Sequence, residues 1–143
     1  MKHILVAIDG SEGGERAFDA ALEMAKRFSA ELLIVSVEQG LLRGDEEVFV
    51  QIENATPDDI LYGAVRHILQ RCEKIARATG FQTVRSFAGL GDPAPFILDI
   101  AKKENVDMIV VGRRGRGHVS RLLLGSVSQK LATFADCKIL IVP

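Results

Sequence analysis

The chain has 143 residues, of which 48% are hydrophobic and 26% are charged, and its formal net charge is −1. This length allows one domain with a substantial core, and the composition excludes a largely disordered chain. A net charge near zero supplies no global field that would draw the protein onto nucleic acid or a membrane, so neither is an expected partner and any anion site must be local.

The cysteines and the first apolar run indicate a cytoplasmic protein. Cys72 and Cys137 have neither a metal-binding spacing nor a disulfide framework around them. We expect reduced core thiols, with a disulfide between the two as the alternative. The apolar run over residues 4–8 is too short for a signal peptide or a membrane span.

The first third of the chain alternates strand and helix patterns. Residues 3–8 form a continuous apolar run, typical of a strand buried on both faces. Asp9 or Ser11 then provides the N-cap of a helix, and residues 31–38 are a second buried strand. The apolar positions with helical spacing in that helix are Phe18, Ala21, Leu22, Ala25 and Phe28.

The middle of the chain begins with an acidic stretch. Residues 40–59 carry six acidic side chains against one arginine and predict a long loop, a candidate flap over a binding site. A long helix follows and ends at Gly80. The residues expected on its buried face are Leu61, Val65, Ile68, Cys72 and Ile75.

Two further strand–helix units and a closing strand complete the pattern. The expected strands cover residues 82–89, 106–112 and 138–143. Asp92 and Pro93 begin one helix as its N-cap and first-turn proline. That helix is expected to bury Phe96, Ile97, Ile100 and Ala101. A last helix runs through Val127 and Leu131.

This order predicts an α/β fold, an open five-stranded parallel sheet with helices on both faces, as a single domain over residues 1–143. Ligands of such sheets bind outside the carboxyl ends of the strands, where the strand order reverses. Asp9, Val37 and Gly112 all follow or end predicted strands, so one crevice would bring them together.

A glycine- and arginine-rich stretch follows the fourth predicted strand. Residues 115–120 (GRGHVS) nearly match the G-x-G-x-x-G/A loop of dinucleotide-binding enzymes, but that loop belongs in the first strand–helix turn. No G-x4-G-K-[ST] loop occurs either. The spacing that remains is G-x2-G-x9-G-S, formed by Gly112, Gly115, Gly125 and Ser126.

These residue types suit a phosphate. Glycines allow close approach of the backbone, and a helix beginning near Ser126 would direct amides and its positive dipole end at the anion. Residues 108–135 contain no acid, and their basic residues are Arg113, Arg114, Arg116, Arg121 and Lys130. The alternative is a soluble surface turn; the position at the switch point of the sheet favours the phosphate site.

The chain resembles the universal stress protein family from end to end, and specifically its ATP-binding branch. The residues that carry the resemblance are ILVAIDGSE (4–12), DMIVVGRRGRG (107–117), LLLGSVSQKL (122–131) and CKILIVP (137–143). In that family the G-x2-G-x9-G-[S/T] spacing separates nucleotide binders from non-binders. The resemblance implies a Rossmann-like sheet of strand order 3-2-1-4-5, an ATP or AMP site with Mg²⁺ as a candidate companion of the phosphates, and a homodimer.

The resemblance also implies residue roles. Asp9 would contact the ribose or adenine, with helix capping as the alternative, and the backbone of Val37 would contact the adenine edge. The phosphate cradle would consist of Gly112, Gly115, Gly125, Ser126 and Ser128. The predicted site further includes Ile8, Val127 and the variable pair Arg113 and Arg114. His118 lies in a variable position and is expected to be solvated.

We therefore expect an adenine-nucleotide-binding stress-response regulator with little or no turnover. The loop offers no carboxylate to position water or Mg²⁺, which weighs against the alternative of a slow ATPase or phosphotransferase, although acids of residues 40–59 could supply one. A nucleotide-free stress scaffold is the second alternative. The stress, the pathway and the regulatory partner are not encoded in any motif.

The last predicted strand indicates a homodimer. Residues Lys138 to Val142 (KILIV) would leave an apolar strand at an open sheet edge, protected only by Lys138. Two-fold pairing of this strand between two chains would satisfy both edges. The alternative is a monomer in which the preceding helix shields the strand.

Overall fold

The chain forms an open parallel sheet in the computed structural model, which describes residues 1–39, 57–114 and 123–143. Five strands in these residues are ordered β3-β2-β1-β4-β5, which confirms the predicted fold class and strand order. The strands are β1 (His3–Ala7), β2 (Glu31–Glu38), β3 (Val84–Leu90), β4 (Met108–Gly112) and β5 (Lys138–Val142). The helices are α1 (Glu12–Phe28), α3 (Pro57–Ala78), α4 (Pro93–Lys103) and α5 (Ser126–Phe134).

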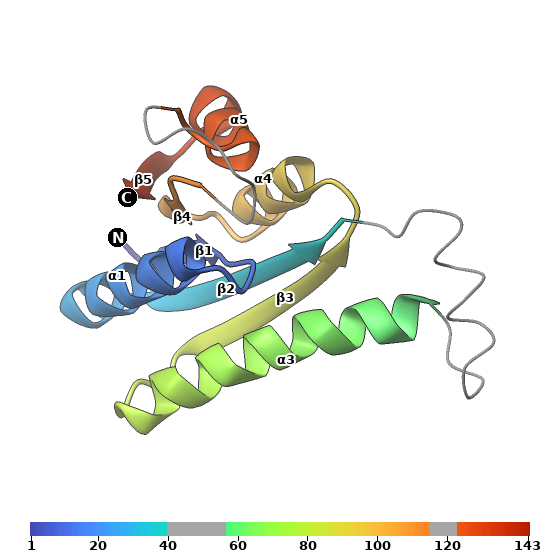
Figure 1. Ribbon diagram of the computed structural model, residues 1–143. Coiled ribbons are helices and arrows are strands. Elements are labelled where there is room, and N and C mark those ends of the chain that lie inside the picture. The colour runs from blue at the N-terminus through green and yellow to red at the C-terminus, as the bar shows by residue number, and fades with distance from the viewer. Residues whose placement is uncertain (40–56, 115–122) are drawn as a thin grey trace.

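The helices cover both faces of the sheet (Figure 1). Ile4 and Val6 of β1 pack in one core cluster with Phe18 of α1, and α3 contributes to the same cluster. Leu5, between them in sequence, packs in a second cluster with Ile97 of α4. Because successive strand side chains point to opposite faces and both faces are covered, the central residues of β1, β2 and β4 are almost all apolar.

Two helix positions differ from the sequence prediction. In residues 62–78 of α3, where burial is described, Val65, Leu69 and Ala76 are buried and Ile75 is 40% exposed; the predicted Leu61 lies outside this range. At 3.6 residues per turn, Ile75 lies roughly 80° around the helix from Val65, at the margin of the apolar stripe. Phe28 is 51% exposed because it is the last residue of α1, where the chain turns towards β2.

The cysteines are free, and the alternative disulfide between them is not formed. Cys72 packs against the core cluster on the α1 and α3 face, and Cys137 packs against the cluster on the opposite face. Burial raises the pKa of the Cys72 thiol to about 11. Cys72 therefore stays protonated at neutral pH and is not a nucleophile.

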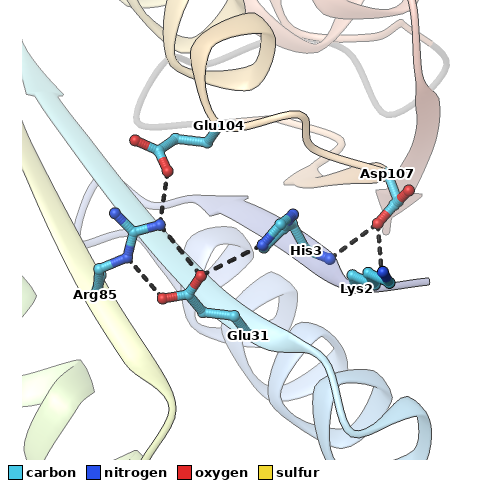
Figure 2. Close-up of polar contacts among 6 residues, drawn as sticks. All are labelled: Lys2, His3, Glu31, Arg85, Glu104 and Asp107. Atoms are coloured by element: carbon cyan, nitrogen blue, oxygen red, sulfur yellow. Dashed lines mark hydrogen bonds and ion pairs between the residues drawn. The ribbon is translucent and has the colours of Figure 1, made fainter.

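A network of charged side chains joins the amino ends of the strands, on the side opposite to the ligand crevice expected for such a sheet (Figure 2). Arg85 donates to Glu31 at 2.6 and 3.1 Å and to Glu104 at 2.6 Å, and His3 Nε2 lies 3.6 Å from Glu31. The carboxylate of Asp107 accepts the main-chain N–H groups at the start of the chain. The network ties β1, β2, β3 and the segment before β4 together.

Candidate functional site

A cavity of about 450 Å³ lies at the carboxyl ends of β1, β2 and β4, where the strand order reverses. Its size is within the range of small-ligand pockets. The predicted site residues that line it are Ile8, Asp9, Val37, Gly112, Arg114, Gly125, Ser126, Val127 and Ser128. Arg113 is not among the lining residues, and Gly115 lies outside the described residues.

The turn from β1 into α1 forms one corner of the cavity. Ser11 is the N-cap of α1, and its hydroxyl oxygen accepts the N–H of Gly14 at 3.1 Å. Asp9 supports this cap, because its Oδ1 accepts the hydroxyl of Ser11 at 2.5 Å and the N–H of Ser11 at 3.0 Å. Gly10 has a φ of +82°, which the turn requires. Ser11 is therefore the N-cap of α1, and the carboxylate of Asp9 fixes the position of Ser11.

The end of β4 packs directly onto the first turn of α1. A Cβ on Gly112 would lie 2.9 Å from the carbonyl oxygen of Gly13, and a Cβ on Gly13 would lie 2.7 Å from the carbonyl oxygen of Arg114. These distances are shorter than van der Waals contact, so only glycine fits at both positions without a shift of the backbone. The two glycines therefore set the close approach of the chain leaving β4 to the start of α1.

The start of α5 forms the opposite side of the same corner. Gly125 is the N-cap of α5 and has no side chain to cap the helix. The first amides of a helix have no intrahelical acceptor, and they carry the positive end of the helix dipole. Ser126 and Val127 follow in the first turn and line the cavity. This corner is therefore suited to an anion.

The hydroxyl of Ser128, a residue expected in the phosphate cradle, is hydrogen-bonded to the protein backbone. It is only 2% exposed, and its hydroxyl donates to the carbonyl oxygen of Arg113 at 2.9 Å and lies 3.1 Å from that of Gly125. A serine hydroxyl has a single hydrogen, and here it is used by the backbone. Ser128 lines the cavity but holds the main chain around it.

The remaining wall of the cavity is apolar. It consists of Ala7, Val35, Val37, Val111, Ile97 and Pro93. Val35 accepts the N–H of Ile8 at 2.9 Å, which continues the β1–β2 pairing to the rim. The cavity thus has an apolar part and a polar corner of glycine backbone and helix N-termini, which suits a ligand with a flat apolar group and an anionic group.

The two arginines that follow β4 differ in position: Arg114 faces the cavity, and Arg113 packs within the protein. Arg114 lines the cavity. The main chain of Arg113 is bonded to α5 and β5, and its side-chain Nε is buried without a hydrogen-bond partner. Lys130 lies 3.8 Å from Asp92, both side chains being largely exposed. Positive charge at the rim therefore comes from Arg114 among the described lining residues.

The lining of the cavity suits an anionic ligand better than a bare metal ion. The corner formed by Gly112, Gly125 and the first turn of α5, which we call the glycine corner, lies at a helix N-terminus and suits an anion. In residues 1–39, 57–114 and 123–143, no group of three or more His, Cys, Asp or Glu side chains is arranged to hold a metal.

Several cavity residues were not predicted from the sequence. Gly14 lies beside Asp9, where a Cβ would be 3.0 Å from the carboxylate, and Pro93 and Ile97 reach the cavity from α4. Glu38 and Gln39 extend the rim beyond Val37. The place of Pro93 in the cavity could have been predicted, because helices that follow strands of a parallel sheet begin at the ligand-binding edge of the sheet.

The fold and the cavity together define a Rossmann-like α/β protein with a cavity at the switch point of its sheet. The chain belongs to the universal stress protein family, whose model matches residues 1–143. It is 36% identical over 149 residues to universal stress protein YxiE of Bacillus subtilis, covering 97% of both chains.

Solved structures agree with this assignment. Universal stress protein UspA from Lactobacillus plantarum superposes with a TM-score of 0.81 at 24% identity, covering 99% of this chain and 97% of that one. A universal stress protein in complex with cAMP has a TM-score of 0.70 at 25% identity, with coverage of 99% and 97%. Of the helices in the described residues, none is both long and apolar enough to span a membrane.

Proposed function

We propose that this protein binds an adenine nucleotide, ATP or AMP, in the cavity at the carboxyl ends of the strands, and that it acts as a stress-response regulator with little or no turnover. The observation that carries the proposal is the glycine corner, where Gly112, Gly125 and the first turn of α5 line the cavity and the helix N-terminus faces it. A relative of the same fold forms a complex with cAMP, which supports an adenine ligand.

The cavity suggests an orientation for the nucleotide. The base would lie against the apolar wall, with the main chain of Val37 at its edge, and the phosphates would lie at Gly112, Gly125 and Ser126. Asp9 would contact the ribose while supporting the cap, because a carboxylate has about four acceptor positions. Gly115 would complete the cradle by virtue of its place in the G-x2-G-x9-G-S spacing.

Mg²⁺ enters the proposal only as a companion of the phosphates. The carboxylates that line the cavity in the described residues are Asp9 and Glu38. Asp9 is already engaged by Ser11, so the phosphate oxygens would provide most of the coordination. Mg²⁺ prefers this arrangement, since it usually retains waters and binds phosphate oxygens with one or two carboxylates.

We further propose a homodimer that forms through β5. Within the described residues β5 pairs with β4 along one edge, and Ile139 to Val142 are half-buried. Antiparallel or parallel addition of the same strand from a second chain would satisfy the other edge.

The two free cysteines support the cytoplasm as the compartment.

The second candidate is a slow ATPase or phosphotransferase. Glu38 at the rim is the observation that favours it, because a carboxylate near the phosphates could position water or a metal. A turnover assay separates the two. Product formation that scales with enzyme and is lost on replacement of Gly115 would support the enzyme, whereas no turnover together with saturable binding supports the regulator.

The third candidate is a nucleotide-free scaffold. It is tested by chromatography of the supernatant of freshly purified, heat-denatured protein. Adenine nucleotide in near-stoichiometric amount would contradict the scaffold. No released nucleotide, together with no binding of added ATP to the native protein, would contradict the proposed function.

A further inference from the structure

Ser128 is a polar side chain buried beside the cavity, and its contacts are with the protein backbone. Its hydroxyl donates to the carbonyl oxygen of Arg113 at 2.9 Å, and that oxygen also accepts the N–H of Gly125 at 2.8 Å. The N–H of Arg113 donates to the carbonyl oxygen of Val142 in β5 at 2.8 Å. The peptide groups of Arg113 are therefore bonded to both α5 and β5. We call this arrangement the Arg113 joint.

The Arg113 joint lies where the proposed phosphate-binding segment begins and ends. Gly112 and Arg114 line the cavity on one side of Arg113 in sequence, and Gly125 and Ser126 line it on the other side of the segment. The hydrogen bond from Gly125 to Arg113 brings these two ends together. The hydroxyl of Ser128 is the one side-chain group among the described residues that donates to the same carbonyl oxygen.

The chemistry of the hydroxyl argues against direct contact with the ligand. A serine hydroxyl has one hydrogen to donate and lone pairs that accept. Once the hydrogen is used on the carbonyl oxygen of Arg113, only acceptor positions remain, and phosphate oxygens are acceptors too. Ser126, two residues earlier, is exposed and lines the cavity, so it is the better placed hydroxyl for a phosphate.

We propose that Ser128 is a positioning residue of the nucleotide site, which fastens the Arg113 joint and so holds the two ends of the phosphate-binding segment in register, without contact with the nucleotide. This inference rests on the proposed function for its consequence in binding. The hydrogen bonds of the Arg113 joint themselves can be tested in the nucleotide-free protein. The Arg113 joint also includes the hydrogen bond to Val142 at the end of β5. Loosening of the joint would therefore also weaken the attachment of this edge strand.

The test compares Ser128→Ala with Ser126→Ala as the matched control. Amide hydrogen exchange of the nucleotide-free proteins, resolved by NMR, reports on the N–H of Gly125 and the N–H of Arg113. Ser128→Ala is expected to accelerate both by about tenfold, since one buried hydrogen bond of the joint is lost. Ser126→Ala leaves them at the wild-type rate. Ser128→Thr retains a hydroxyl and is expected to restore slow exchange.

The binding arm uses ATP and adenosine on the wild-type protein, Ser128→Ala and Ser128→Thr; Ser126→Ala is a control for the exchange arm alone, because Ser126 is proposed to contact the phosphates. Ser128→Ala should weaken ATP about tenfold and leave adenosine within about twofold, because the joint affects only the phosphate end. A general loss of structure would weaken both ligands and lower the melting temperature, which would overturn the proposal. Faster exchange with unchanged ATP affinity would also overturn it.

The two arms separate this proposal from the proposed function. Wild-type exchange rates in Ser128→Ala overturn the positioning role even where the wild-type protein binds ATP. Failure of the wild-type protein to bind any nucleotide refutes the proposed function, and it also overturns Ser128 as a positioning residue of a nucleotide site. If no nucleotide binds but Ser128→Ala accelerates exchange, Ser128 stabilises the fold and has no role in a nucleotide site.

Discussion

Gly112 and Gly13 are in contact through their main chains, although they are far apart in sequence: a Cβ on Gly112 would lie 2.9 Å from the carbonyl oxygen of Gly13. This contact seats the end of β4 on the first turn of α1, and Gly112 also lines the cavity. Any side chain at position 112 must therefore displace the main chain of α1 or of the segment that follows β4.

Gly112→Ala is expected to destabilise the fold by about 1–3 kcal/mol, the usual cost of overpacking in a rigid interior. It should also weaken ATP binding, because the displaced backbone belongs to the proposed phosphate corner. Urea unfolding and calorimetric titration measure the two effects. The control is Gly63→Ala on α3, where a Cβ would meet nothing within 4 Å.

Gly63→Ala should stabilise the protein by roughly 0.5–1 kcal/mol, because alanine restricts the unfolded chain and favours helix. Its ATP affinity should equal that of the wild-type protein. An alanine at position 112 that is as well tolerated as one at position 63 would show that the contact between α1 and β4 has little importance.

Ser126→Ala tests the hydroxyl proposed to face the phosphates. Loss of a hydrogen bond to a charged group should weaken ATP by about 1–3 kcal/mol. Stability should hardly change, because Ser126 is exposed. Equal ATP affinity of this variant and the wild-type protein, measured by calorimetry, would remove Ser126 from the site.

Ionic strength should affect phosphorylated ligands and spare adenosine. Arg114 lines the cavity and is only partly buried, so its attraction for phosphate is screened as salt rises. ATP affinity should fall between low and physiological salt, and ATP should bind more tightly than adenosine at low salt. Equal binding of ATP and adenosine at low salt would mean that the glycine corner is not a phosphate cradle.

Acid should destabilise the protein through the network at the amino ends of the strands (Figure 2). Hydrogen bonds from Arg85 hold the pKa of Glu31 below its usual value, and main-chain N–H groups of His3 and Lys2 do the same for the pKa of Asp107. A lowered folded-state pKa means that the stabilisation is complete above the unfolded-state values of about 4. It is lost as the pH falls through the lower folded-state values.

Glu31→Gln is therefore expected to reduce stability at pH 7 and to flatten its decline between roughly pH 5 and pH 2. Glu23→Gln is the control, because Glu23 pairs with Arg27 in an exposed position on α1 and such pairs contribute about 0–1 kcal/mol. Urea unfolding at several pH values measures both. Parallel pH profiles for Glu31→Gln and the wild-type protein would contradict the role of the network.

Physical reading of the sequence was sufficient to predict the parallel sheet and most of the cavity lining, whereas the strand order came from the family resemblance. Apolar runs and helical periodicity locate the elements, and the parallel topology places their carboxyl ends together. The contact of Gly13 with Gly112 is not visible in the sequence, because Gly13 has no unusual spacing and its partner lies in another element. The hydrogen bond of Ser128 to the main chain of Arg113 could not be predicted for the same reason, because the sequence shows a hydroxyl but not its acceptor.

Pairing of β5 is tested with Ile141→Lys. A lysine on the proposed dimer strand should place like charges next to each other across a two-fold axis and convert a dimer to a monomer. Light scattering across a dilution series measures the mass, and circular dichroism verifies the fold. Ile75→Lys is the control, since Ile75 is 40% exposed on α3, which packs on β2 and β3 at the opposite edge of the sheet.

Ile75→Lys should have the same mass as the wild-type protein at every concentration. A wild-type protein that is monomeric throughout the dilution series, or a folded Ile141→Lys that remains dimeric, would contradict the β5 interface.

The central claim is that an adenine nucleotide binds at the glycine corner, and calorimetric titration of nucleotide-stripped protein with ATP tests it most directly. The account predicts saturable binding at one site per chain. It also predicts loss of that binding in Gly115→Val, because a β-branched side chain blocks the backbone approach that glycine permits. No saturable binding by the wild-type protein, or equal ATP affinity in Gly115→Val, would contradict it.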